Sequence, residues 1–252
     1  MVKAIVGSCW GDEGKGKITD MLAEKADIVI RFQGGSNAGH TIINDYGKHA
    51  LHQMPSGVFN ENTVNIIGNG VAFNVPYFIK ELNYLKESGI KEPKVLISDR
   101  VQLLMPYHIL FDTLEEARLS DKQFGSTKSG IAPFYSDKYA KLGIQICDLF
   151  HEDILMERIK AACEIKNVLL EHLYHHEPLN PQAIFDEVLG YKKYVEPYIT
   201  NTAEYLNKAI SDGKEILLEG QLGALKDPDH GIYPMTTSSS TLAGFGAIGA
   251  GI

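Results

Sequence analysis

The sequence predicts an α/β fold with a mostly parallel central sheet, a phosphate-binding loop and an inserted helical subdomain. Short apolar runs alternate with segments of helical periodicity, and most of these runs end in loops rich in glycine and polar residues. A long middle stretch instead contains helix formers and charges with few glycines. Ligands of open α/β sheets bind beyond the carboxyl ends of the strands, so the glycine-rich loops mark the candidate site.

The first half of the chain contains the repeating units of this fold. Residues 2–7 form an apolar run that ends at a glycine, and the segment from Ile18 onward carries apolar side chains at helical spacing. A strand, a glycine-rich loop and a helix are therefore expected. The other elements predicted in this half are strands at residues 26–32, 64–68 and 95–98 and a helix at about residues 76–88.

The domain organisation of the chain is predicted from these changes in amino-acid composition and hydrophobic pattern. We predict a nucleotide-binding α/β core over residues 1–147, a helical subdomain over residues 148–209 inserted in that core, and a return to the core over residues 210–252. The return begins with a buried strand at residues 214–219. The chain ends in a Gly/Ala/Ile run, which is typical of the interior of a fold, so we expect an amino-terminal portion of a longer protein.

Composition excludes several classes of protein. The chain has 252 residues, of which 44% are hydrophobic and 22% charged, which excludes collagen-like, low-complexity and broadly disordered chains. No run approaches the roughly 20 apolar residues that cross a bilayer. The net charge of −8 argues against binding to nucleic acid or acidic membranes. Three widely spaced cysteines indicate a reduced, cytoplasmic protein, and Cys9 is interpreted as a small buried residue.

The first glycine-rich loop, residues 11–17, matches the Gly-x4-Gly-Lys spacing of a phosphate-binding loop. Lys15 and Lys17 add positive charge there. The match fails at Ile18, where Ser or Thr would coordinate magnesium, and the loop also contains two acids that would repel phosphate. Of these, Asp12 is suited to binding Mg²⁺ or accepting a proton. The alternative role for it is a helix N-cap.

The second loop, residues 34–41, contains Asn37 and His40. The Asn37 amide is suited to a phosphate or a base edge, and His40 could stabilise charge on a leaving oxygen. A structural or exposed histidine is the alternative. Three weaker polar loops lie at residues 125–133, 219–223 and 236–241; five such loops indicate a polyphosphate ligand and a second polar substrate. His175 and His176 are expected to face solvent because no metal-ligand spacing surrounds them.

Several segments together closely resemble the adenylosuccinate synthetase family, in order along the whole chain. They are residues 10–17, 33–41, 51–57, 66–70, 130–138, 229–234 and 237–241. The resemblance implies that GTP phosphorylates O6 of IMP and that L-aspartate then displaces the phosphate to give adenylosuccinate. It also implies that Asp12 is the proton acceptor, that His40 is the proton donor with Lys15 as a further catalytic residue, and that Asp12 and the Gly39 carbonyl bind Mg²⁺.

The resemblance further implies two sets of nucleotide contacts and a homodimer. The GTP set is Gly11, Asp12, Glu13, Gly14, Lys15, Gly16, Lys17, Gly39, His40 and Thr41. The IMP set is Asp12, Glu13, Gly14, Lys15, Asn37, Ala38, Gly39, His40, Thr127, Lys141, Gln221, Leu222 and Thr237.

Three departures from the family pattern are visible. Lys141 stands where the family commonly places an arginine that reaches IMP across the dimer, and lysine lacks the bidentate fork. Gln221 lies one position before the usual glutamine, which is replaced by Leu222. Family members also continue beyond Ile252 with the aspartate-binding loop and the guanine-recognition segment. Two alternatives to the ligase stay open: a GTP-binding module resembling a GTPase, and a folded fragment without complete activity.

Overall fold

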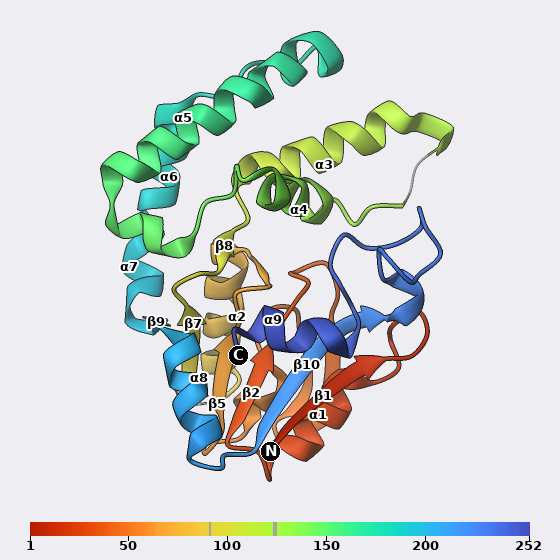
Figure 1. The fold of residues 1–252 in the computed structure, drawn as a ribbon, viewed down its shortest axis with the longest axis vertical. Helices are drawn as coiled ribbons and strands as arrows, with labels where there is room; N and C mark the ends of the chain where they lie inside the picture. Colours follow the sequence, from red (N-terminus) through yellow and green to blue (C-terminus); the bar gives the residue numbers. More distant parts are fainter. Residues whose placement is uncertain (91, 123–124) are drawn as a thin grey trace.

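In the part of the chain that the structure describes, the central sheet has six strands, all parallel, in the order β1-β10-β2-β5-β7-β9 (Figure 1). This computed structural model describes residues 1–90, 92–122 and 125–252. The predicted α/β fold with a mostly parallel sheet is confirmed. The strands are β1 (Val2–Gly7), β2 (Ile28–Arg31), β5 (Val64–Ile67), β7 (Val95–Ser98), β9 (Ile199–Thr200) and β10 (Ile216–Gly223).

Strand β10 follows the other five in the chain but lies between β1 and β2. Ile216 is opposite Val2 on one side and Ile28 on the other. Parallel pairing brings the carboxyl ends of these strands to one edge of the sheet. The loops that follow β1, β2 and β10 therefore meet there, although they are far apart in the sequence.

The helices begin with different kinds of cap. The Asn74 side chain accepts a hydrogen bond from the Tyr77 amide at the start of α2, and Asn201 does the same for Glu204 in α8. Helix α1 starts after Gly14 with no side-chain cap, which leaves first-turn amides for another acceptor. The helices are α1 (Lys15–Ala23), α2 (Val75–Glu87), α3 (Pro106–Leu119), α4 (Ile131–Ala140), α5 (Glu152–Leu169), α6 (Pro181–Leu189), α7 (Lys192–Val195), α8 (Thr202–Ser211) and α9 (Gly246–Ala250).

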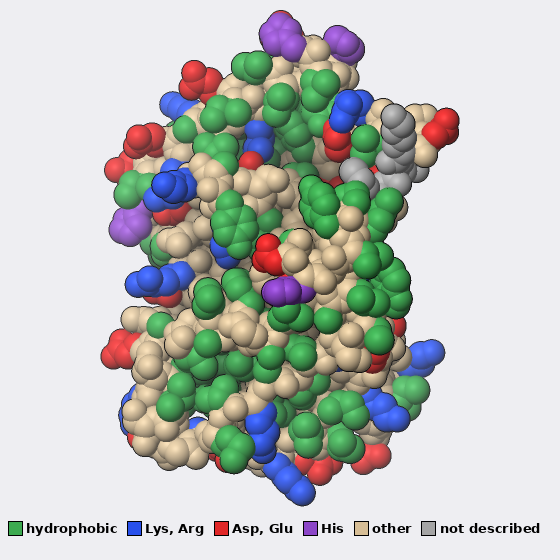
Figure 2. Space-filling view, turned by 45° about the vertical axis from the view of Figure 1, so that its right-hand side comes forward, with side chains coloured by type: hydrophobic (Ala, Val, Ile, Leu, Met, Phe, Trp, Pro, Cys, Tyr) green, Lys and Arg blue, Asp and Glu red, His purple; other side chains and the backbone are tan. Residues whose placement is uncertain are grey.

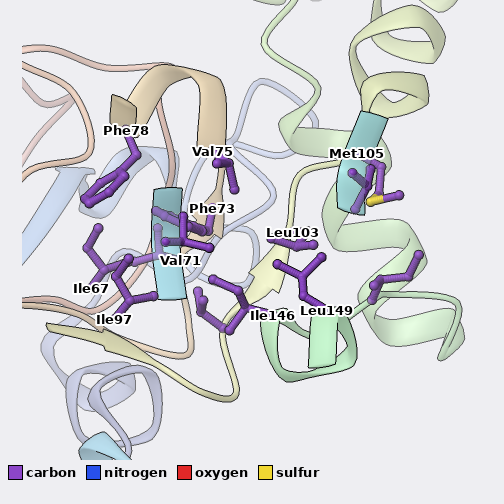
Figure 3. Close-up of a cluster of buried hydrophobic side chains, with 14 of the residues drawn as sticks. Ile67, Val71, Phe73, Val75, Phe78, Ile97, Leu103, Met105, Ile146 and Leu149 are labelled. Atoms are coloured by element: carbon purple, nitrogen blue, oxygen red, sulfur yellow. The ribbon is translucent and has the colours of Figure 1, made fainter. Parts of the chain in front are cut away.

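Apolar side chains of β2 point alternately to the two faces of the sheet, as the strand period requires. Val29 packs with Ala23 of α1, whereas Ile28 and Ile30 belong to a cluster that contains Leu206 of α8. A larger cluster surrounds α2 and extends from the sheet into the helical region (Figure 3). It includes Leu155 and other residues of α5, so the sheet and these helices share one apolar core.

The helical region lies beyond one edge of the sheet, with α3, α4, α5 and α6 together in Figure 1. Lys166 of α5 lies 2.8 Å from the Asp137 carboxylate of α4, which ties the region together. Within the range predicted as a helical subdomain, β9 pairs with β7 and α8 packs on the sheet. The division at residues 147 and 209 stays a prediction.

Several element boundaries differ from the prediction. Strand β2 begins at Ile28, and β10 runs on to Gly223 because its glycine-rich end still pairs with β1. The main omission is an antiparallel hairpin that places His40 on a strand instead of in a loop. Its alternation buries Ile42 and leaves Ile43 exposed. The hairpin strands are β3 (His40–Asn44) and β4 (Gly47–Leu51), and β6 (Ala72–Phe73) pairs with β8 (Gln102–Leu103).

The surface carries mixed charge. Figure 2 shows basic and acidic side chains interspersed on one face, with no continuous basic patch in that view. None of the helices in residues 1–90, 92–122 and 125–252 has the length and apolar character needed to cross a membrane.

Candidate active site

The loop between β1 and α1 has the backbone conformation of an anion-binding turn. Gly11 and Gly14 have φ angles of 112° and 85°, which glycine adopts without a steric penalty. Asp12 also has a positive φ, 59°, which is uncommon for a residue with a side chain. Asp12 does not cap α1, because Gly14 occupies the N-cap position and no side-chain cap bond is present there. The N-cap role considered for Asp12 is therefore wrong.

The second acid of this loop, Glu13, is bound within the loop. One of its carboxylate oxygens accepts a hydrogen bond from the Cys9 amide, and the other lies 3.6 Å from Lys15 Nζ. Burial lowers the pKa of Lys15, and the neighbouring carboxylates of Glu13 and Asp12 oppose that shift. Glu13 therefore compensates the buried lysine, which leaves Asp12 as the acid that faces the cavity.

His40, the first residue of β3, is buried with a defined hydrogen-bond arrangement. Its Nδ1 lies 2.5 Å from Glu219 Oε1, so the ring donates Nδ1–H to that carboxylate. Arg31 Nη1 lies 3.1 Å from the same nitrogen, where it adds positive charge and cannot donate a hydrogen bond to a protonated Nδ1. His40 Nε2 is buried and has no hydrogen-bond partner among the described residues.

The charges around His40 set its protonation. Burial and then the Arg31 charge lower the pKa of His40, and the opposing effect of Glu219 is smaller. Burial alone would raise the pKa of Glu219, but His40, Arg31 and the Ser56 hydroxyl outweigh it and lower that pKa. We take Glu219 to be ionised and His40 to be neutral without a ligand. An anion at Nε2 would favour protonation of the ring.

Gly16, in the first turn of α1, lies against His40. A Cβ atom at this position would be 2.6 Å from His40 Cβ and 3.3 Å from the Ser56 hydroxyl. Gly14, in contrast, has open space around it, and its positive φ is the reason for glycine there. The glycines of this loop therefore have different roles: one sets the turn, and the other makes room for the imidazole.

These loops enclose a cavity of about 250 Å³. All nine residues that line it are among the predicted site residues. The lining residues are Asp12, Gly14, Lys15, Gly16, Ala38, Gly39, His40, Thr41 and Leu222. The cavity therefore brings together a carboxylate, a cation, an imidazole nitrogen without a partner and an uncapped helix end, a set suited to a phosphate group.

Gln221 has a different environment from the predicted contact with IMP. Its side chain is fully buried, with Oε1 accepting from the Gly35 amide at 2.9 Å. Its Nε2 lies within hydrogen-bond distance of acceptors on Gly35, Asn37 and Ala38. The amide thus fixes the second loop, and its contact with IMP stays a prediction.

The remaining predicted contacts lie outside the residues that line the cavity. Asn37 is half-buried and bonded to Gln221, whereas Lys17 and Lys141 are exposed. Thr127 is exposed and donates to Ser129. Thr237 is half-buried, with its amide bonded to the Lys226 carbonyl. Gly11 and Glu13 belong to the first loop but do not line the cavity.

Buried acids anchor the later loops. Asp112 of α3 accepts from the Ser126 hydroxyl and the Gly130 amide, which fixes the loop around Thr127. Asp227 accepts from the Thr241 amide and two further amides in the loop that contains Thr237. These hydrogen bonds fix the backbone of two loops whose Ser, Thr and Gly content alone would predict little regular structure.

Sequence reasoning missed three buried residues behind His40: Arg31, Ser56 and Glu219. Glu219 receives hydrogen bonds from the Ser56 amide at 2.8 Å and from the Ser56 hydroxyl at 2.5 Å. The sequence does contain a signal for Arg31 and Glu219, because each is a charged residue at the end of an otherwise apolar strand. Such residues are almost never fully buried without a partner.

The cavity contains oxygen donors suited to magnesium. Mg²⁺ is usually bound by one or two protein oxygens together with waters and substrate phosphates. The Asp12 carboxylate and the Gly39 backbone both line the cavity, which fits that mode. No group of three or more His, Cys, Asp or Glu side chains suited to a metal occurs within the described ranges.

The structure also decides the exposure of one cysteine and two histidines outside the cavity. Cys9 is exposed, so its interpretation as a small buried residue is wrong; the strand has ended at Gly7 and the residue lies in the loop. His175 and His176 are both exposed, which confirms that expectation.

Comparison with known proteins identifies relatives along the whole chain. A family model described as adenylosuccinate synthetase matches residues 4–252. The adenylosuccinate synthetase of Dehalococcoides mccartyi strain CBDB1 is 49% identical over 251 residues, covering 100% of this chain and 59% of the relative. That of Clostridium botulinum strain 657 is 44% identical over 250 residues, covering 98% of this chain and 58% of the relative. The chain thus spans less than two thirds of these relatives.

Solved structures agree in fold. The fully ligated adenylosuccinate synthetase from Plasmodium falciparum superposes with a TM-score of 0.87 at 34% identity, over 100% of this chain and 58% of that chain. Succinoaminodeoxyadenylate synthetase of cyanophage S-2L has a TM-score of 0.67 at 16% identity, covering 100% of this chain and 59% of that chain, which indicates a shared fold alone.

Proposed function

The chain belongs to the adenylosuccinate synthetase family, and from that premise we propose that it carries the nucleotide site of a GTP-dependent carbon–nitrogen ligase. The proposed reaction joins IMP and L-aspartate to form adenylosuccinate through a 6-phosphoryl-IMP intermediate, in the AMP branch of purine nucleotide biosynthesis. The observation that carries the proposal is the cavity in which Asp12, Lys15 and the unpartnered His40 Nε2 lie together.

Asp12 has the proposed role of general base. The O6 atom of a hypoxanthine ring is a poor nucleophile until the N1 proton is removed, and a carboxylate at the cavity wall can accept that proton. This role explains why an acid occupies a loop that otherwise attracts phosphate. Glu13 cannot replace it in this arrangement, because its oxygens are engaged with Cys9 and Lys15.

His40 has the proposed role of proton donor to the transferred phosphoryl group. Its Nδ1–H is bound to Glu219, so Nε2 is the nitrogen available to a ligand. Negative charge that develops on the phosphoryl oxygens would be stabilised by protonated Nε2 and by the ammonium group of Lys15. The uncapped amides of α1 would bind the same phosphates.

Magnesium is the proposed cofactor, held by the Asp12 carboxylate and the Gly39 carbonyl. When bound, it would neutralise phosphate charge and orient the transferred group. The remaining proposed contacts are those predicted for GTP and IMP, including Thr127, Lys141, Gln221 and Thr237. We also propose a cytoplasmic homodimer, with no nucleic-acid or membrane partner.

An alternative is a GTP-binding module that resembles a GTPase and lacks complete ligase activity. Ile18 argues against an ordinary GTPase, because it occupies the position at which a Ser or Thr hydroxyl would bind magnesium. A GTPase would release phosphate from GTP without IMP, whereas the ligase requires both IMP and aspartate.

The test is adenylosuccinate formation, followed by absorbance, from GTP, Mg²⁺, IMP and aspartate, with this chain and with a version extended to the length of its relatives. The proposal expects product that depends on both IMP and aspartate in the extended protein. Phosphate release that is independent of IMP would favour the GTPase-like alternative.

Asp12→Asn should lower turnover of the extended protein by about 100-fold or more, because the amide cannot accept the proton. Its melting temperature should match that of the wild type. Asp153→Asn, at an exposed acid in the first turn of α5, is the control and should retain activity. Wild-type turnover in Asp12→Asn would remove Asp12 as the base.

A further inference from the structure

The carboxylate of Glu219 lies directly behind the candidate proton donor. Glu219 belongs to β10, His40 begins β3, and Ser56 begins the 3-10 helix η1 (Ser56–Phe59). Three elements that are distant in sequence therefore meet at one fully buried carboxylate. It lies on the protein side of the imidazole, whereas His40 itself lines the cavity.

Hydrogen bonds hold Glu219 in one orientation. Oε2 accepts from the Ser56 amide, and Oε1 accepts from both the Ser56 hydroxyl and His40 Nδ1. The carboxylate is therefore fixed from the backbone of one element and from side chains of two. A group fixed in this way can determine which imidazole nitrogen carries hydrogen and how the ring is turned.

Arg31 provides the compensating charge. Its Nη1 lies 3.9 Å from Glu219 Oε1, and its Nη2 donates to the His52 carbonyl at 3.0 Å. In the sheet, Arg31 and Glu219 are register partners on adjacent strands. An isolated buried carboxylate would be strongly destabilising, so this pairing allows Glu219 to stay charged beside the ring.

Gly16 also lies against His40. The absence of a side chain there lets α1 approach the His40 Cβ, as the 2.6 Å separation from a hypothetical Cβ indicates. The histidine is thus packed against the first turn of α1 and bonded to the carboxylate of β10. Its only nitrogen without a hydrogen-bond partner in the described residues is Nε2.

We propose that Glu219, held by Ser56 and Arg31, is a positioning residue that fixes His40 in the Nδ1–H form and turns Nε2 toward a phosphate oxygen in the cavity. This inference rests on the proposed phosphoryl transfer for its catalytic consequence. Its structural content, the form and orientation of the ring, can be tested without turnover.

The first test is nuclear magnetic resonance of the chain labelled with ¹⁵N in histidine. The His40 signals are identified by their loss in His40→Gln. The proposal expects a neutral ring with hydrogen on Nδ1 in the wild type, and in Glu219→Gln a ring that has lost this single form. Ser56→Ala, which removes one of the bonds that fix Glu219, should show an intermediate mixture. Unchanged His40 signals in a folded Glu219→Gln would overturn the proposal, as would hydrogen on Nε2 in the wild type.

The second test is steady-state kinetics of the extended protein. Glu219→Gln should lower kcat by about tenfold or more, as expected for loss of a carboxylate that orients a catalytic imidazole, with a smaller change in KM for GTP. Ser56→Ala should fall between this variant and the wild type. The control is Glu157→Gln, an exposed acid of the same size on α5, which should match the wild type.

The two tests separate this inference from the proposed function. If the wild type formed no adenylosuccinate, the proposed function would fail, while the spectra would still decide the role of Glu219. If Glu219→Gln failed to fold, Ser56→Ala would supply the same comparison with the carboxylate retained. A folded Ser56→Ala with wild-type spectra and wild-type kcat would then overturn the proposal.

Discussion

Two buried clusters in this protein have the same composition, an imidazole, a carboxylate and a cation, but differ in how the imidazole is used. The site cluster is His40, Glu219 and Arg31, and the helix cluster is His108, Asp137 and Lys166. The site cluster lies at the edge of the sheet, and the helix cluster lies where α3, α4 and α5 meet.

The helix cluster satisfies both nitrogens of its histidine. His108 Nδ1 accepts from the Met105 amide at 3.0 Å, and Nε2 lies 2.9 Å from Asp137. Lys166 binds the same carboxylate and lies 4.9 Å from the centre of the Tyr107 ring. In the site cluster, His40 lines the cavity and its Nε2 has no hydrogen-bond partner among the described residues. The difference between these two clusters is therefore one unused nitrogen, which His40, the proposed proton donor, has and His108 does not.

Replacement of His40 would produce the largest difference between the clusters. We expect His40→Gln to lower turnover of the extended protein by about 100-fold or more, the range of general acid–base catalysis. Its thermal unfolding should stay close to that of the wild type, because the glutamine amide can still donate to Glu219 in place of Nδ1–H and Nε2 makes no hydrogen bond to the described part of the chain. His108→Gln should show the reverse pattern, with turnover retained and stability reduced. Equal loss of turnover in both variants would contradict the distinction.

Removal of the helix-cluster carboxylate should lower the free energy of unfolding. Asp137→Asn leaves Lys166 buried without a negative partner, and breaking such a pair costs about 3–5 kcal/mol of unfolding free energy. The measurement is urea unfolding followed by circular dichroism. Asp212→Asn, at an exposed ion pair with Lys208, is the matched control and should leave the transition unchanged. A folded Asp137→Asn that unfolds like the wild type would show that the helix cluster adds little stability.

Acid should weaken the fold through the buried histidines. Burial lowers the pKa of His108 below that of an unfolded histidine, so the unfolded chain takes up protons first. This contribution is complete above about pH 6.5 and is lost as the pH falls toward the lowered pKa of the folded state. Unfolding free energy should therefore fall between about pH 7 and pH 5, and less steeply in His108→Gln. His172→Gln, at an exposed position, should keep the wild-type slope. Identical slopes in all three proteins would remove His108 as a source of the acid sensitivity.

Local sequence pattern was sufficient to predict much of the fold and the loops that form the cavity, whereas most of the individual lining residues were implied by the family resemblance. The apolar runs at β1 and β7 have the predicted bounds, and the glycine spacing of residues 11–17 identified the first loop. Strand ends and loop composition are local properties, which a single sequence records directly. The nine cavity residues come from these loops and from the start of β3 and the end of β10.

The residues behind the cavity depend on long-range pairing. Glu219 meets His40 only because β10 inserts between β1 and β2, a contact across 179 positions of sequence. A one-residue change of register would turn Glu219 to the other face of the sheet. The hairpin at His40 was missed for a different, local reason, since its short alternating strands follow directly on a glycine-rich loop.

The central claim is that His40 presents Nε2 to a phosphate while Glu219 holds Nδ1. A crystal structure of the chain with a non-hydrolysable GTP analogue, IMP and Mg²⁺ tests it most directly. We predict a phosphate oxygen within about 2.7–3.2 Å of Nε2, with the Glu219 contact retained. Phosphates bound away from this cavity, or a His40 ring turned away from them, would contradict the account.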